Sequence, residues 1–201
     1  IEGASKKAEL KFQKQCPAIY QYLLQFKESL SKRNTVETGI RYEWYALQRC
    51  AATYYPEFKK EKVVWGNIAY NSSFVLLGKG VFLNAPGNII TSDNVSLRYL
   101  LGCLNSSIFN YEFQKIGIFL GHAFEWKKQY VEQVHITPPT AENRLIVDKI
   151  ETLVDEILAL KKSDLSAATT AQEREIDKLV YELYELTDDE IEIVENFHKK
   201  A

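Results

Sequence analysis

The chain of 201 residues is 46% hydrophobic and 12% aromatic, so it can bury a core and is not a disordered segment. Its net charge of −2 is unevenly distributed: residues 1–139 hold 17 Lys and Arg against 11 Asp and Glu, while residues 140–201 hold 8 against 16. A basic body with an acidic tail is typical of a protein in which one part meets a polyanion. The sequence contains no Met, and we expect it to be a piece of a longer polypeptide.

Cysteine spacing and hydropathy exclude several classes of protein. Cys16, Cys50 and Cys103 are odd in number and lack C-x-x-C spacing, which argues against a disulfide framework and against a zinc site. No apolar run is long enough to cross a bilayer, and the first residues carry no targeting pattern. We therefore expect an intracellular protein that binds neither a metal ion nor a membrane.

Residues 16–33 are predicted to form a helix. Pro17 suits a first helical turn, and the apolar residues after it recur on one face. Lys32 and Arg33 suit the negative end of a helix dipole, and Asn34 follows as a stop signal.

Residues 40–92 are predicted to form several short strands. Their apolar runs are rich in Val, Ile, Phe and Trp and are separated by Gly, Asn, Ser and Pro. The runs are VVWGNIAY, SFVLL, VFLNAP and NIIT. The stretch GKGVFLNAPG lies between two strands rather than before a helix, so we expect a hairpin there and not a phosphate-binding loop.

Helical spacing returns over residues 96–116. Asn105 and Ser106 favour caps over helix interiors, so they are predicted to divide this segment into two helices.

The alternation of YVEQVHI, residues 130–136, predicts a half-buried strand that ends at Pro138 and Pro139. We place a domain boundary at these prolines, with a recognition domain over residues 1–139 and a helical tail over residues 140–201.

The tail is predicted to contain two antiparallel helices and a short third one. SDLSAATT has no periodicity and is expected to connect the first two helices. Thr187 and Glu190 have the spacing of a capping box at the start of the third helix. The apolar residues of the first helix repeat with the spacing of a coiled-coil seam, and a second run follows in the next helix: Ile146, Ile150, Leu153, Ile157 and Leu160, then Ile176, Leu179, Val180 and Leu183.

Catalytic motifs are absent from the sequence: it contains no G-x-G-x-x-G, Walker A, G-x-S-x-G or H-E-x-x-H pattern. One alternative is a metal-dependent nuclease, since Glu125-Trp126-Lys127 has the Glu-x-Lys spacing of such enzymes and Asp93 lies upstream. The same triple also begins at Glu9 and Glu57, which weakens this alternative.

Five stretches together resemble, in order, the C-terminal specificity domain of TaqI-type DNA methyltransferases and of type IIG restriction–modification enzymes. They are RYEWYALQRC (41–50), YYPEFKKEKVVWGNI (54–68), LRYLLGCLNSSIFNYEF (97–113), FEWKKQYVEQVHITPP (124–139) and KLVYELYELTDDEIEIVE (178–195).

The resemblance implies a target recognition domain that binds double-stranded DNA beside an N6-adenine methyltransferase domain in a prokaryotic cytoplasm. The implied fold is α+β, with a mixed β-sheet, flanking helices and a C-terminal helical hairpin. The NPPY-type catalytic motif and the S-adenosylmethionine-binding motif of that family are absent here. The fragment is therefore expected to bind DNA without methylating it and to need no cofactor itself, while S-adenosylmethionine serves the catalytic domain. Whether the parent protein also contains a nuclease domain stays open.

Residue type indicates which side chains are expected to contact DNA. Cations neutralise phosphates, and Arg and Asn can also read base edges. The asparagines could instead stabilise turns, which Asn favours. Trp44 could instead be buried, with the aliphatic parts of Arg41 and Arg49 packed along its ring. The candidates are Arg41, Trp44, Arg49, Lys59, Lys60, Lys62, Asn67, Tyr70, Asn71, Lys79, His122, Lys127 and Lys128.

A second function from another class is a protein-interaction module that assembles through its coiled-coil-like C-terminal helices. DNA binding should weaken steeply with salt, whereas assembly through an apolar seam should not.

Overall fold

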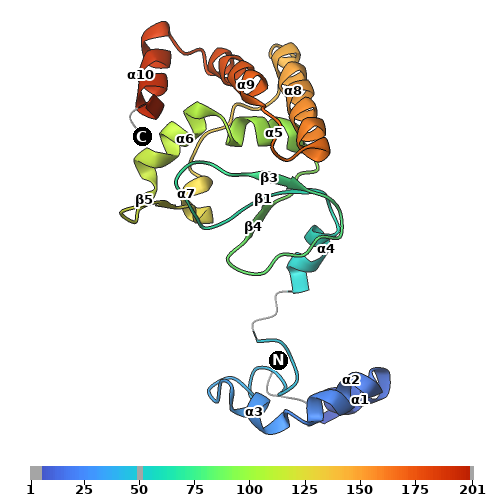
Figure 1. The fold of residues 1–201 in the computed structure, drawn as a ribbon. Helices are drawn as coiled ribbons and strands as arrows, with labels where there is room; N and C mark the ends of the chain where they lie inside the picture. Colours follow the sequence, from blue (N-terminus) through green and yellow to red (C-terminus); the bar gives the residue numbers. More distant parts are fainter. Residues whose placement is uncertain (1–5, 49–51, 200–201) are drawn as a thin grey trace. The chain divides into compact units, whose positions relative to one another are not determined.

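The computed structural model describes residues 6–48 and 52–199, apart from the side chains of residues 52, 198 and 199. It is an α+β structure in which two compact units follow one another along the chain (Figure 1). Unit 1 is Ile1–Thr53 and unit 2 is Tyr54–Ala201. The expected boundary at Pro138 and Pro139 thus lies inside unit 2. No described helix is both long enough and apolar enough to span a membrane.

Unit 1 contains three short helices, α1 (Lys6–Gln15), α2 (Pro17–Leu24) and α3 (Lys27–Lys32). The single helix predicted over residues 16–33 is therefore two, and α1 was not predicted. The interruption falls at Phe26, whose φ of −109° and ψ of 7° leave the helical region. Its amide donates to the Leu23 carbonyl, three residues back, so the last turn of α2 tightens and ends.

One carboxylate organises the small core of unit 1. Glu9 Oε1 accepts from Trp44 Nε1 (3.0 Å), Tyr20 Oη (3.0 Å) and Lys27 Nζ (3.3 Å). The Trp44 and Tyr20 rings are buried beside it. The Trp44 hydrogen bond, more than the other contacts, lowers the pKa of Glu9 against the opposing effect of burial.

The first sheet of unit 2 has β1 (Lys62–Trp65) at its centre. Antiparallel strands flank it, β3 (Val75–Leu77) on one side and β4 (Asn88–Ile90) on the other. The expected hairpin at GKGVFLNAPG is therefore wrong, because β1 lies between the strands that this loop joins. VFLNAP also forms no strand.

A second three-stranded sheet has the order β2 (Ile68–Ala69), β6 (Phe124–Glu125), β5 (Ile118–Phe119), with antiparallel pairs. Before the first sheet, the 3-10 turn Ala52–Tyr54 leads into α4 (Tyr55–Phe58).

The predicted division of residues 96–116 is confirmed: α5 (Leu97–Leu104) and α6 (Ser107–Ile116) meet at Asn105 and Ser106. Ser106 Oγ accepts from the Phe109 amide and caps α6.

The strand expected over residues 130–136 is wrong. Its first residues belong to α7 (Lys128–Val131), where the amides of Tyr130 and Val131 donate to the Lys127 carbonyl. Val131 is buried at the end of α7, and Val134 beyond it is partly buried against the same core, so these apolar residues serve a short helix and the turn after it instead of a strand.

The predicted C-terminal helices are confirmed as α8 (Arg144–Ser163), α9 (Thr170–Leu183) and α10 (Asp188–Lys199). The predicted capping box is also confirmed: the Thr187 amide donates to Glu190 Oε2, and the Glu190 amide donates to Thr187 Oγ1. The apolar positions of α9 are buried as expected. On α8 the buried positions are Val147, Ile150 and Val154, and the predicted seam residues Ile146, Leu153 and Ile157 are only partly buried.

Unit 2 is layered. In Figure 1 the strands lie on one side of α5 and α6, and α8, α9 and α10 lie on the other. One hydrophobic core runs through these layers, from Val63 on β1 to Ile150 on α8 and Val180 on α9. Helix α8 approaches α5 so closely that a Cβ built on Gly102 would lie 2.6 Å from Ile150 Cγ2.

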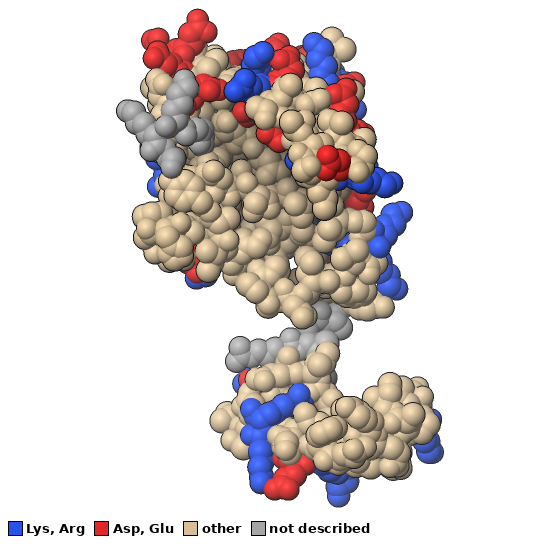
Figure 2. Space-filling view, in the orientation of Figure 1, with Lys and Arg blue, Asp and Glu red and all other residues tan. Residues whose placement is uncertain are grey.

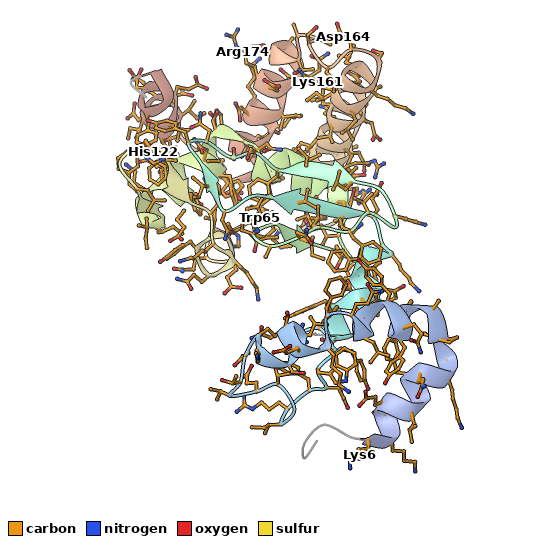
Figure 3. The ribbon with its side chains drawn as sticks, turned by 60° about the horizontal axis from the view of Figure 1, so that its bottom comes forward. Lys6, Trp65, His122, Lys161, Asp164 and Arg174 are labelled. Carbon is orange, nitrogen blue, oxygen red and sulfur yellow. The ribbon has the colours of Figure 1, made fainter. Side chains whose placement is uncertain are left out.

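Two tryptophans join the sheets to the helices. Trp126 stacks on Phe113 of α6, with ring centroids 3.7 Å apart. Trp65, labelled in Figure 3, lies on β1 and donates from Nε1 to the Trp126 carbonyl at 2.7 Å. These contacts fix the relative positions of the two sheets.

Candidate nucleic-acid interface

A cationic groove lies at the edge of the first sheet of unit 2. Its cavity of about 430 Å³ is open to solvent, and four basic side chains line it together with the carboxylates of Glu61 and Asp93. The basic side chains come from the α4–β1 connection, the β3–β4 loop and the start of α5. They are Lys59, Lys60, Lys79 and Arg98.

Lys60 is already engaged by carboxylates. Its Nζ lies 2.9 Å from Asp93 Oδ2 and 3.3 Å from Glu57 Oε2. These hydrogen bonds, first from Asp93 and then from Glu57, raise the pKa of Lys60. Thr91 Oγ1 donates to Glu57 and is the main reason that the pKa of this carboxyl is lowered. Lys60 therefore offsets carboxylate charge in the groove.

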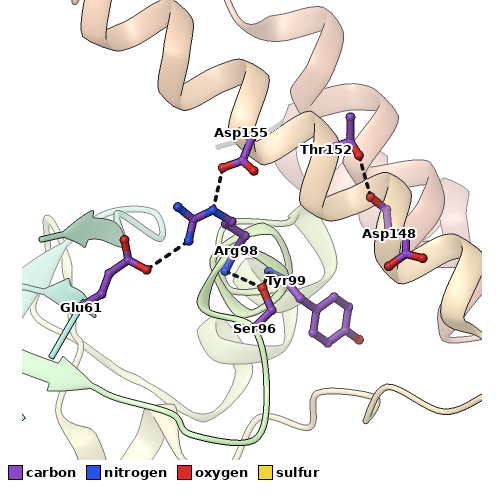
Figure 4. Close-up of polar contacts among 7 residues, drawn as sticks. All are labelled: Glu61, Ser96, Arg98, Tyr99, Asp148, Thr152 and Asp155. Carbon is purple, nitrogen blue, oxygen red and sulfur yellow. Dashed lines mark hydrogen bonds and ion pairs between the residues drawn. The ribbon is translucent and has the colours of Figure 1, made fainter.

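Arg98 is a structural cation (Figure 4). Its Nε donates to Asp155 Oδ1 on α8 at 2.6 Å, and its Nη1 donates to Glu61 Oε2 at 3.0 Å. Both contacts raise the pKa of the guanidinium. Arg98 thus ties the first sheet to α5 and α8.

Lys59 and Lys79 are the exposed cations of the groove with least competition from carboxylates. The Lys59 ammonium lies 4.9 Å from the Tyr55 ring centroid. Within the described part of the chain, Lys79 makes no hydrogen bond or ion pair, and its side chain is exposed on the β3–β4 loop. These two ammonium groups can meet an external anion.

The sequence reasoning placed Lys62 with these lysines, but the structure corrects this. Lys62 is 0% exposed, and its Nζ donates to the Gly78 carbonyl at 3.0 Å. Side chains alternate in direction along a strand, yet every residue of β1 is buried, so Lys62 points into the protein. It cannot reach a phosphate from there.

The candidate asparagines lie around the second sheet and have partners within the protein. Asn67 Oδ1 accepts from Asn88 Nδ2 at 2.6 Å. Asn71 Oδ1 accepts from Asn110 Nδ2 at 3.1 Å and from Gln114 Nε2 at 3.3 Å. Both side chains thus take part in turn and loop structure, the alternative reading of these residues.

The remaining unit 2 candidates also gather near this sheet. Tyr70 is partly exposed beside Phe124. Exposed His122, labelled in Figure 3, follows Gly121 in the β5–β6 turn, where Gly121 has a φ of +89° that favours glycine. Lys127 pairs with Glu125 at 2.8 Å, and Lys128 pairs with Glu132 at 3.5 Å.

Two candidates belong to unit 1, and a third is not described. Arg41 is exposed and forms an ion pair with Glu37 at 3.0 Å. Trp44 is only 8% exposed and bonds Glu9, so its ring face belongs to the core of unit 1. Arg49 and Cys50 lie outside the described residues.

The sequence reasoning missed three aromatic residues and Arg98. Tyr55, Phe58 and Phe82 lie beside the cationic groove, with Phe58 and Phe82 stacked at 5.0 Å between ring centroids. The signal for the first two was the run YYPEF directly before the lysines. Nothing in the sequence alone joined them to Phe82, since the contact depends on the β3–β4 loop.

The groups required for metal-dependent cleavage are not assembled in the described residues. Asp93 pairs with Lys60 and Glu125 pairs with Lys127. No group of three or more His, Cys, Asp and Glu side chains in residues 6–48 and 52–199 could hold a metal ion.

Burial raises the pKa of the Cys103 thiol to about 12, so this thiol stays protonated at neutral pH.

Charge is segregated on unit 2. Figure 2 shows, on the face in view, a broad uncharged surface across its strands, Lys and Arg along one edge, and Asp and Glu interspersed with Lys and Arg over the C-terminal helices. The acidic tail of the sequence thus becomes an acidic end of the folded unit.

A groove lined by four basic side chains on an α+β domain is a site suited to an anionic ligand. Residues 6–136 match the family model of the TaqI-like C-terminal specificity domain, and the chain therefore belongs to this family. It is a DNA-recognition specificity domain of the kind found in restriction–modification enzymes. A search of curated proteins found no match to the chain.

Proposed function

We propose that this domain selects a specific sequence in double-stranded DNA for an N6-adenine methyltransferase of the type IIG restriction–modification class. The family match over residues 6–136 carries this proposal. In it, a methyltransferase domain of the same polypeptide binds S-adenosylmethionine and transfers the methyl group, and this chain supplies recognition only.

Lys59 and Lys79 are the proposed phosphate contacts of unit 2. Both are exposed and they line one groove, and the two carboxylates that line it with them, Asp93 and Glu61, are paired with Lys60 and Arg98. Phosphate contacts of this kind fix the position of a protein on DNA, while other groups read the bases. Tyr70 and His122, at the second sheet, are the proposed candidates for base contact.

Fluorescence anisotropy with a pool of random duplexes, measured at several salt concentrations, tests this proposal. Each lost phosphate contact should lower the slope of log affinity against log salt by about 0.9. The double variant Lys59→Ala/Lys79→Ala should therefore lose a slope of about 2. Lys178→Ala is the matched control, because Lys178 is an exposed lysine on α9 that pairs with Glu175. Binding that is insensitive to salt, or an equal loss in the control, would contradict the proposal.

The alternative function, assembly through the C-terminal helices, requires an apolar face on them. Ile150, Leu179 and Leu183 are buried within unit 2. Sedimentation velocity at low and high salt tests this alternative: a salt-resistant oligomer without DNA binding would favour it.

A further inference from the structure

Two exposed aromatic side chains and one partly buried ring form a group beside the cationic groove, which we name the aromatic platform: Tyr55 and Phe82 are exposed, and Phe58 is partly buried. Phe58 stacks on Phe82 with ring planes 21° apart, and the Tyr55 centroid lies 5.8 Å from that of Phe82. Tyr55 is 53% exposed and Phe82 is 55% exposed. Ring surface thus remains open to solvent although the rings already contact one another.

The backbone holds the aromatic platform in place. Tyr55 and Phe58 belong to α4, and Phe82 belongs to the long loop between β3 and β4. The Gly80 amide donates to the Phe58 carbonyl at 3.0 Å, which fastens this loop to α4. Gly80 has a φ of +77°, a conformation that favours glycine and turns the loop toward the helix. The rings are therefore positioned before any ligand arrives.

Cations flank the aromatic platform on both chain segments. Lys59 follows Phe58 directly and lies over the Tyr55 ring at 4.9 Å, while Lys79 precedes Gly80 in the loop. Exposed rings beside lysines are the combination that binds unpaired nucleic acid, because a base stacks on the ring while the ammonium groups contact the phosphates next to it. Paired bases in a duplex present only their edges and leave such ring faces unused.

We propose that the aromatic platform stacks on a nucleobase that has left the duplex, with Lys59 and Lys79 contacting the phosphates on either side. This inference rests on the proposed DNA-binding function and deepens it, since it makes distorted or locally unpaired DNA the preferred ligand. Methylation of a base requires that base to leave the stack, so a specificity domain that binds unpaired bases would favour the opened duplex.

The test compares two duplexes of the same length and sequence, one fully paired and one with a single bulged 2-aminopurine. The full 201-residue chain should bind the bulged duplex about tenfold more tightly and should quench the 2-aminopurine fluorescence, as expected for one stacked base. Phe82→Leu and Tyr55→Leu should abolish this preference while changing binding of the paired duplex less than twofold. Tyr55→Phe should keep it, because it retains the ring.

Tyr22→Leu is the matched control, since Tyr22 is 59% exposed on α2 of unit 1 and belongs neither to the platform nor to the second sheet. Thermal denaturation verifies that each variant is folded. Equal wild-type affinity for both duplexes, with salt-sensitive binding intact, would overturn the aromatic platform and leave the proposed function standing. An equal effect of Tyr22→Leu, or platform leucine variants that keep the preference, would also overturn it. Failure to bind either duplex would overturn both proposals.

Discussion

Gly102→Ala tests whether the C-terminal helices are an integral part of unit 2. An added Cβ would lie 2.6 Å from Ile150 Cγ2 and 3.3 Å from Val154 Cγ2, and real Cβ contacts are essentially never shorter than 3.0 Å. Overpacking a core costs about 1–3 kcal/mol, and a contact this short belongs at the upper end of that range. Replacing Gly by Ala within a helix returns about 1 kcal/mol. The net expectation is a loss of about 1–2 kcal/mol in the free energy of unfolding.

Urea denaturation followed by circular dichroism measures this loss. Gly66→Ala is the control, because nothing lies within 4 Å of its Cβ position, and it should stay within about 0.5 kcal/mol of the wild type. In an Ile150→Ala background the clashing methyl is gone, so Gly102→Ala should become neutral or stabilising, and the double-mutant cycle should show a coupling of about 1 kcal/mol or more. If Gly102→Ala is as stable as the wild type in the native background, α8 does not pack on α5 as described and the reasoning fails.

Three further predictions concern charged side chains. Glu9→Gln should destabilise unit 1 by about 1 kcal/mol at pH 7. The pKa of Glu9 is lowered in the folded state, chiefly by Trp44, so this stabilisation is present above the unfolded pKa of about 4.3 and is lost as pH falls through the folded pKa. The melting temperatures of wild type and variant should therefore converge at low pH. Asp177→Ala should cost about 1–2 kcal/mol in urea denaturation, because Asp177 accepts from the Ser107 amide at 2.7 Å and from its hydroxyl at 2.8 Å at the start of α6; an unchanged midpoint would count against this cap. Lys62→Met should leave the salt slope of DNA binding unchanged, because Lys62 is buried; a reduced slope would return Lys62 to the interface. The same variant should have a free energy of unfolding equal to that of the wild type or up to about 1 kcal/mol higher, because it removes a buried charge.

The division of charge has a consequence for orientation on DNA. Lys59, Lys60 and Lys79 of the groove belong to the strand layer of unit 2 and Arg98 belongs to α5, whereas the acidic C-terminal helices lie on the other side of α5 and α6. Because repulsion by phosphates disfavours contact with acidic side chains, we expect the tail to face away from the duplex. Its buried leucines, Leu179 and Leu183, then belong to the core of unit 2.

Elements with strong local signals could be predicted from the amino-acid sequence. Ser106 could be recognised as a cap, Thr187 and Glu190 as a capping box, and the α9 positions as a buried face, because each depends on hydrogen bonds or spacing within a few residues. The α+β class and the family resemblance followed from short stretches of sequence whose residues are also close together in the chain. Local chemistry was sufficient at all of these places.

Strand pairing and the exposure of individual lysines could not be predicted in this way, because both depend on the tertiary structure. Residues 78–87 have the composition of a hairpin, yet β3 and β4 pair with β1 from opposite sides. Strand residues of this sheet and residues of the helices share one hydrophobic core, which is a long-range contact. Lys62 reads like its neighbours Lys59 and Lys60, yet it faces inward, because β1 is the central strand and is covered on both faces. The aromatic platform, finally, joins residues 24 or more positions apart. Pairing, burial and such contacts depend on long-range packing, and no pattern within a short stretch of sequence encodes it.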